Sequence, residues 1–252
     1  MVLDLGQRIQ STCRECEMSF DRSDVNDVAL HTKYHERMTR GVEWSTKLVD
    51  AGEECGSVNI PPAIAKKLKA GSNEVRLLRY SLASNTNAML SRKIEEVCKC
   101  VDEALGAARL ADQARKEGKL LVGVSKSGRV LGAAVVGPCP PKSARRVAPH
   151  EDGKDAVFIS DDPAEARSPP LAVHRIHVLH PARRAGLGVA LLDAALAGAV
   201  YGMSTASIER MCGGRAGTTA FSQPTQAGRK LAEAWIERGG SAPLELLISH
   251  AL

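Results

Sequence analysis

The run from Arg175 to Leu196 constrains this chain more than any other stretch, because it predicts a strand, a tight turn and a helix in that order. The turn carries an R-x-x-G-x-G arrangement formed by Arg183, Gly186 and Gly188. Glycines let a backbone approach a ligand closely, and the first amides of a helix have no intrahelical acceptor. The turn therefore suits a bound phosphate, although the glycines of a simple tight turn would give the same pattern.

Two well-known phosphate loops do not fit this turn. A Walker loop requires a Lys and then a Ser or Thr after its last glycine, and no such pair follows Gly188. A dinucleotide-binding loop requires a third glycine, where this chain has Leu191. The helix after the turn carries an apolar stripe made of Val189, Leu192, Leu196 and Ala199. Such a stripe anchors a helix against a sheet, so we expect the turn to lie between rigid elements.

A second motif lies near the N-terminus, where Cys13 and Cys16 form a CxxC and His31 and His35 form an HxxxH. Two thiolates and two imidazoles at these spacings complete a tetrahedral Zn²⁺ shell and leave no open position for catalysis. We therefore predict a structural Cys2His2 zinc finger within residues 1–44, with an N-terminal lead and an exit helix.

The helix of this finger is poorly suited to reading DNA. If His31 is the seventh helical residue, the base-reading positions are Asp24, Asp27 and Leu30. Two carboxylates and a leucine are poor partners for guanine, and the carboxylates repel phosphate. We therefore expect no sequence-specific DNA reading and interpret the finger, with Phe20 and Val28 in its small core, as a protein-docking or stabilising module.

The composition fits one catalytic domain with a small appended module. The chain has 252 residues, and aromatic residues make up only 3% of them, so its core must be built from aliphatic side chains. The formal charge of +5 is too mild to require a nucleic-acid partner. The sequence shows no apolar run as long as a membrane span and no signal core, and five of its seven cysteines have no regular spacing. These features predict a soluble intracellular protein with free thiols.

Between the two motifs the sequence predicts mainly sheet and helix. Residues 45–90 read as a linker or short amphipathic helix followed by a first strand. Residues 91–118 have the apolar spacing of one helix that stops at Gly118. Two apolar runs around Ser127 and Gly128 predict a hairpin of buried strands.

After this hairpin, residues 138–170 combine prolines with charged clusters and predict an exposed, partly disordered insertion. Residues 171–179 predict a strand, residues 204–217 a mobile loop, residues 218–222 a strand and residues 244–252 a final strand. In the intervening SQPT segment, Pro224 is expected to hold Gln223 extended, and Thr225 to cap a helix that runs towards Arg238. A second helix N-terminus should then lie beside the first.

Taken together, these motifs are similar to those of a known family. The strand, turn and helix resemble the pyrophosphate loop of the GNAT superfamily of acetyl-coenzyme A dependent N-acetyltransferases. With the finger before it and the SQP tripeptide after it, the chain resembles the eukaryotic sister-chromatid cohesion establishment acetyltransferases over residues 3–44 and about 94–236. The resemblance implies an α+β fold, a GNAT-type mixed sheet flanked by helices, with the GNAT core in residues 91–252 after the zinc finger.

The resemblance also implies where acetyl-CoA binds. The cofactor would lie along a strand backbone, at the phosphate loop and at the second helix N-terminus. The residues implied are Ile176, His177, Val178, Arg183, Arg184, Ala185, Gly186, Leu187, Gly188, Val189, Ser222, Thr225, Gln226 and Ala227.

Transfer to a lysine requires the neutral amine, whose ammonium form has a pKa near 10.4, so a base or a desolvating site is needed. The resemblance implies a catalytic role for Asp193, which aligns with an acidic residue of the family, and a lysine-orienting role for Gln223. This chain departs from the family where GISRIW becomes AVHRIH, so His174 replaces a serine and His177 a tryptophan. His174 is a candidate base, and the alternative is that both histidines are strand residues satisfied by their neighbours.

The resemblance implies a nuclear protein-lysine acetyltransferase that modifies the SMC-type ATPase subunit of cohesin during DNA replication. Its implied partners are the cohesin head and, through a peptide upstream of the finger, the replication sliding clamp. Two alternatives stay open: a zinc-finger adaptor with a catalytically weak GNAT-like domain, and an acetyltransferase for small amines.

Overall fold

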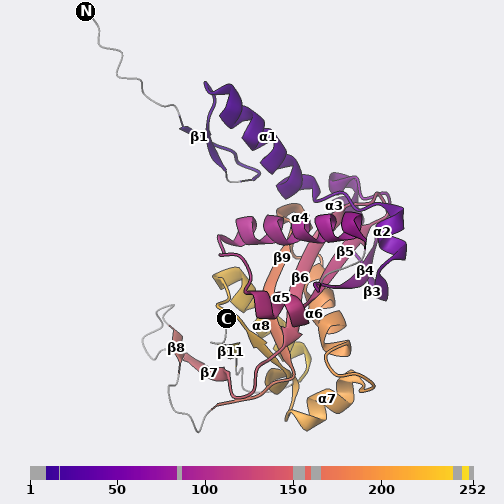
Figure 1. Ribbon diagram of the computed structural model, residues 1–252, viewed down its shortest axis with the longest axis vertical. Helices are drawn as coiled ribbons and strands as arrows, with labels where there is room; N and C mark the ends of the chain where they lie inside the picture. Colours follow the sequence, from indigo (N-terminus) through magenta and orange to yellow (C-terminus); the bar gives the residue numbers. More distant parts are fainter. Residues whose placement is uncertain are drawn as a thin grey trace, which may run out of the picture.

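A computed structural model describes residues 10–16, 18–83, 87–149, 157–159, 166–240 and 246–249. The chain forms a mixed sheet flanked by helices, as predicted, with a small two-stranded sheet in the finger (Figure 1). The large sheet has nine strands in the order β3-β4-β5-β6-β9-β10-β11-β7-β8. In that order they are Glu53–Asn59, Glu74–Ser81, Lys119–Ser125, Val130–Pro138, Leu171–Val178, Thr219–Phe221, Leu246–Ser249, Ala144–Pro149 and Val157–Ile159. Strand β10 is parallel to β9 and to β11, and the other neighbours are antiparallel.

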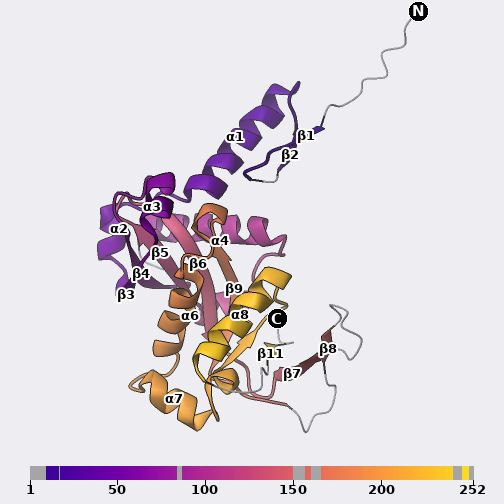
Figure 2. The same cartoon turned by 180° about the vertical axis from the view of Figure 1, so that it is seen from behind.

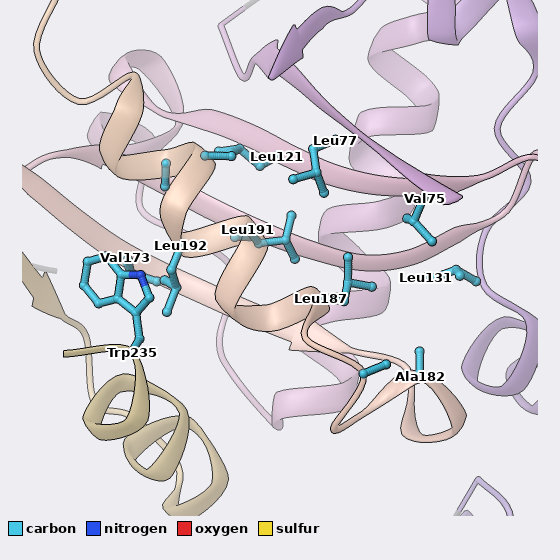
Figure 3. Packing of buried hydrophobic residues seen from close by; sticks show 14 of the residues in the cluster. Val75, Leu77, Leu121, Leu131, Val173, Ala182, Leu187, Leu191, Leu192 and Trp235 are labelled. Carbon is cyan, nitrogen blue, oxygen red and sulfur yellow. The ribbon is translucent and has the colours of Figure 1, made fainter. Parts of the chain in front are cut away.

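Helices cover both faces of this sheet, which explains why β5 and β6 are nearly continuous apolar runs. Helix α4 (Ala88–Leu105) and α2 (Thr46–Asp50) pack on one face. Helices α3 (Pro62–Leu68), α6 (Leu187–Ala197) and α8 (Gln226–Arg238) pack on the other (Figure 2). Figure 3 shows Leu187 and Leu191 of α6 against the strands of the sheet and Leu192 of α6 beside Trp235 of α8.

The finger consists of β1 (Gln10–Thr12), β2 (Ser19–Asp21) and α1 (Val25–Arg40), and α1 continues beyond the histidines to the large sheet. Asp24 caps α1 by accepting from the Asn26 amide. Phe20 is buried as expected, but Val28 is 37% exposed, so its predicted place in the finger core is wrong. Met38, in the last turn of α1, is buried in the cluster that α4 forms with the sheet, and Tyr34 packs against the same cluster, so the C-terminal half of α1 joins the finger to the core.

Helix α4 ends earlier than its apolar spacing predicts. Gly106 adopts a left-handed conformation with φ +60°, and its amide bonds back to the last turn of α4. The chain then forms a loop before the short helix α5 (Asp112–Glu117). The predicted single helix over residues 91–118 is therefore two helices, because a left-handed glycine ends the first.

Three other segments are more ordered than the sequence indicates. Strand β3 lies inside the predicted linker. Its residues are mostly exposed and polar, so no apolar pattern predicted a strand there. The predicted mobile loop at 204–217 contains α7 (Thr205–Met211), capped by Ser204, and the start of η3 (Arg215–Thr218). The predicted insertion at 138–170 contributes β7 and β8, and within it residues 150–156 and 160–165 lie outside the described residues. The remaining predicted strands and α8 are confirmed, and no helix in the described part of the chain is long and apolar enough to span a membrane.

Candidate functional site

The site begins where strands β9 and β10 separate. Their parallel register covers Leu171 to Val173, and the amide of Ser222 makes the last bond, to the Val173 carbonyl at 3.0 Å. Strand β9 continues to Val178 against β6 alone, so its other edge has no strand partner within the described chain. This separation leaves an open edge of backbone at the centre of the sheet.

A cavity of about 460 Å³ lies at this opening. Its walls are the middle of β9, the end of β10, the start of α8 and the loop between α4 and α5. The lining residues are 105–111, 173–176, 221–225 and 228. Among the predicted site residues, the cavity brings together His174, Gln223, Ile176, Ser222 and Thr225.

His174 occupies a β-bulge at the wall of this cavity. On β6, Val135 pairs with Arg175 and Val136 pairs with Val173, so His174 is the extra residue between them. The residue is 5% exposed, and its Nδ1 atom has no hydrogen-bond partner among the described residues. Burial, with a smaller contribution from the Arg175 charge, lowers its pKa to about 4. The imidazole is therefore neutral at neutral pH.

Gln223 lies opposite, in the turn from β10 to α8. Its φ is +31°, so the expectation that Pro224 holds it extended is wrong. A left-handed glutamine before a proline is strained, and such strain persists where the surrounding structure requires it. Here the turn is held by Thr225, whose Oγ1 accepts from the Gly228 amide at 3.2 Å, as predicted, and by Ser222, whose Oγ donates to the His174 carbonyl at 2.6 Å.

The phosphate loop connects β9 to α6 through the short helix η2 (His180–Ala182). Arg184 and Gly186 adopt left-handed conformations, with φ of 63° and 83°. Among the described residues, no backbone acceptor pairs with the amides of 184–189. Arg183 donates through Nε to the Val178 carbonyl at 3.1 Å, while Gly188 packs against Leu231 of α8. These contacts hold a row of free amides at the start of α6, which is the arrangement that a phosphate requires.

His177 does not join the cavity. It points to the face of the sheet that α4 covers, where it borders a small space beside α1 and β6. Burial, then the Arg183 charge, lowers its pKa to about 4. Its side chain is thus separated from the acceptor side of the site, and any cofactor contact at this position would come from its backbone.

Asp193 also lies outside the cavity lining. Its Oδ1 accepts from the Trp235 indole Nε1 at 2.7 Å, and Arg215 Nη1 lies 3.6 Å away. Trp235 is fully buried, and the Arg215 guanidinium stacks over its ring. The carboxylate therefore joins α6 to α8 and η3, which is a structural contact.

Arg175 is a site residue that the sequence analysis missed. Its Nε lies 3.1 Å from Asp102 Oδ1, and its two terminal nitrogens donate to the carbonyls of His174 at 2.8 Å and Ala108 at 3.0 Å. It thereby holds the α4–α5 loop onto the bulge of β9. An arginine inside an apolar strand is a signal for such a buried ion pair, and it was available in the sequence.

The predicted metal ligands come together in the finger. Ligand atoms of Cys13, Cys16, His31 and His35 lie within 4.8 Å of one another. His31 Nε2 is buried without a hydrogen-bond partner in the described chain. Hydrogen bonds from nearby backbone amides lower the pKa of the Cys13 thiol to about 6. An unpaired imidazole nitrogen beside an acidic thiol fits a Zn²⁺ ion, which would be structural because four protein ligands fill its shell.

Comparison with known proteins agrees with this geometry. The family model described as the zinc finger of the ESCO acetyltransferases matches residues 1–37, and the model described as the ESCO1/2 acetyltransferase matches residues 169–244. The N-terminal part of the chain is thus similar to the ESCO zinc finger, and its C-terminal part is similar to the ESCO acetyltransferase domain. The second match covers the opening between β9 and β10, the phosphate loop and α8, so the chain is an acetyltransferase.

Curated relatives have similar names. The N-acetyltransferase ECO1 of Candida glabrata is 26% identical over 92% of this chain and 85% of its own length. The ECO1 protein of Saccharomyces cerevisiae is 24% identical over 87% and 81%. The N-acetyltransferase eso1 of Schizosaccharomyces pombe is 24% identical over 89% of this chain, which spans only 23% of that longer relative.

Solved structures confirm the fold. The xEco2 acetyltransferase domain bound to a K105-CoA conjugate superposes with a TM-score of 0.54 and 22% identity. The match covers 71% of this chain and 93% of that domain. Because this identity is low, the likeness supports the fold of the chain and leaves its substrate to be argued separately.

Proposed function

We propose that this chain transfers an acetyl group from acetyl-CoA to a lysine of the SMC-type ATPase subunit of cohesin, in the nucleus during DNA replication. The observation that carries the proposal is the cavity at the β9–β10 opening, which brings His174 and Gln223 together on the strand that leads to the phosphate loop. The family's name and the names of its relatives support the acetyl transfer. The cohesin head and the replication sliding clamp are proposed as partners.

The free amides of 184–189 would bind the pyrophosphate, with Arg184 adding charge and the open edge of β9 bordering the pantetheine arm. Acetyl-CoA supplies an activated acyl carbon, so attack by a neutral lysine amine forms a C–N bond and breaks the C–S bond. The cavity positions that amine and excludes water from it. The Gln223 side-chain carbonyl can accept a hydrogen bond from the amine but cannot take its proton.

We propose an imidazole as the proton acceptor, because no Asp or Glu is among the described residues that line the cavity. His174 Nδ1 is buried, unpaired and neutral, so it is free to accept. A base with a pKa of about 4 accepts only from a strongly acidic donor. The lysine nitrogen becomes such a donor as its bond to the acyl carbon forms, so proton transfer would accompany bond formation.

The test uses labelled acetyl-CoA and intact cohesin heads. His174→Ala should lower turnover by about 10²-fold, the typical contribution of a general base, while leaving CoA affinity within about twofold. His177→Ala is the matched control, because it removes a histidine of the same strand that is not among the described residues lining the cavity. Cofactor binding without transfer by the wild type would contradict the proposed activity and favour an adaptor. Equal rates in the two variants would contradict the role of His174.

A further inference from the structure

The charged side chains among the described residues that line the cavity are all positive. They are Arg109 and Arg175, and none of these described lining residues is acidic. Arg175 is compensated, since Asp102 lies 3.1 Å from its Nε. A lysine that enters this cavity therefore meets one cation that the protein does not neutralise closely, and that cation is Arg109.

Arg109 has a weakly held, accessible guanidinium. Its side chain is 72% exposed, and its nearest carboxylate oxygen, on Glu95, lies 3.8 Å from Nη2. The other Glu95 oxygen makes a closer contact with Arg115. Glu95 is thus engaged elsewhere, and the Arg109 side chain can bind an incoming anion at little cost.

The backbone that carries Arg109 is nevertheless fixed. On one side, the Ala108 carbonyl accepts from Arg175 at 3.0 Å. On the other side, Leu110 is buried in the core beneath α4. The Ala107 amide also bonds to the Asp102 carbonyl at 2.9 Å. An exposed arginine on a loop anchored at both neighbours keeps its backbone at a constant place on the cavity rim, so its guanidinium stays within reach of a ligand there.

We propose that Arg109 determines specificity by pairing with an acidic side chain next to the acceptor lysine. This inference rests on the proposed function of the cavity as the lysine channel. A lysine ammonium alone would be repelled by Arg109, whereas a neighbouring Asp or Glu offsets that repulsion. A guanidinium also matches a carboxylate with two parallel hydrogen bonds, so the pair has a defined geometry.

The experiment measures affinity rather than turnover. CoA is joined to the lysine of peptides that differ only in one flanking residue, Asp, Asn or Lys, placed before or after the acceptor. At low salt the wild type should bind the Asp conjugate about three- to fivefold more tightly than the Asn conjugate, the range expected of an exposed ion pair. The Lys conjugate should be the weakest. Arg109→Gln should remove the preference, and Arg109→Glu should reverse it.

Lys99→Glu is the matched control, since Lys99 is similarly exposed and lies 3.9 Å from a helix carboxylate, outside the cavity lining. This variant should keep the wild-type preference, and CoA alone should bind all four proteins equally. Equal binding of the three conjugates by the wild type, each tighter than CoA, would overturn the role of Arg109 and leave the proposed function standing. Conjugates that bind no better than CoA would instead contradict the cavity as the lysine channel.

Discussion

Substitutions of Asp193 can distinguish a catalytic role, which the family resemblance implies, from a structural role, which its observed contacts imply. The family resemblance gives its carboxylate a part in catalysis, whereas the structure uses it as the acceptor for the buried Trp235 indole. Two substitutions separate these roles. Asp193→Asn removes the charge and keeps an acceptor oxygen for the indole, while Asp193→Leu removes both.

The magnitudes follow from exposure. The Asp193 side chain is 52% exposed and Arg215 also binds Glu209 at 2.7 Å, so the lost ion pair in Asp193→Asn should cost at most about 1 kcal/mol. In Asp193→Leu the fully buried indole N–H loses its acceptor, at a cost of about 1–3 kcal/mol. For a chain of this size that cost corresponds to a Tm lower by roughly 2–12 °C.

The assay combines urea unfolding with turnover at a temperature where all variants are folded. We expect Asp193→Asn to retain turnover within about threefold of wild type, and Asp193→Leu to lose stability before it loses cofactor binding. If Asp193 instead handles the substrate proton, Asp193→Asn should lose about 10²-fold in turnover at unchanged stability. That pattern would refute the structural assignment.

Three further outcomes are expected. Gly186→Asp should weaken CoA binding by more than tenfold, because it adds negative charge at the free amides. Gly202→Asp is the control, because Gly202 has a similarly left-handed and open position, and it should leave CoA binding unchanged. Equal effects of the two substitutions in calorimetric titration would contradict the phosphate site. Elemental analysis should find one Zn²⁺ per chain, and the Cys13→Ser variant should lose this zinc and unfold at a lower Tm. A zinc-free wild type, or a variant as stable as the wild type, would contradict the metal site. His174 and His177 have folded-state pKa values near 4, so stability is complete above about pH 6.5 and falls as the pH drops towards 4. At pH 5.5 each should cost about 1.4 kcal/mol in urea unfolding, and a flat profile between pH 7 and 5.5 would contradict their burial.

Much of the fold could be predicted because its signals are local. The R-x-x-G-x-G turn marked the start of α6, and Thr225 marked the start of α8, since each uses backbone chemistry that few residues supply. The ligand spacing of the finger was equally local. Strand β3 had no such signal, because an edge strand with one partner carries exposed polar residues.

The side-chain directions at the site could not be predicted in the same way. Strict alternation along β9 fails at His174, where a bulge adds a residue against β6. Without the pairing register, nothing in the sequence separates His174, which lines the cavity, from His177, which borders a different space beside α1 and α4. The role of Asp193 was hidden for a similar reason, because its partner Trp235 is distant in sequence.

Around the cavity the structure differs from the prediction at three places, and the three differences have one physical cause. The helix that was predicted to continue ends at Gly106, the glutamine predicted to be extended is left-handed, and the strand bulges at His174. A periodic sequence pattern predicts a regular helix or strand. Each of these three irregularities instead makes room for the cavity or places a group at its wall. A continuous α4 would remove the loop that presents Arg109, and an unbulged β9 would change the face on which His174 lies. The departures from regularity therefore coincide with the walls of the site, as expected where function competes with local preference.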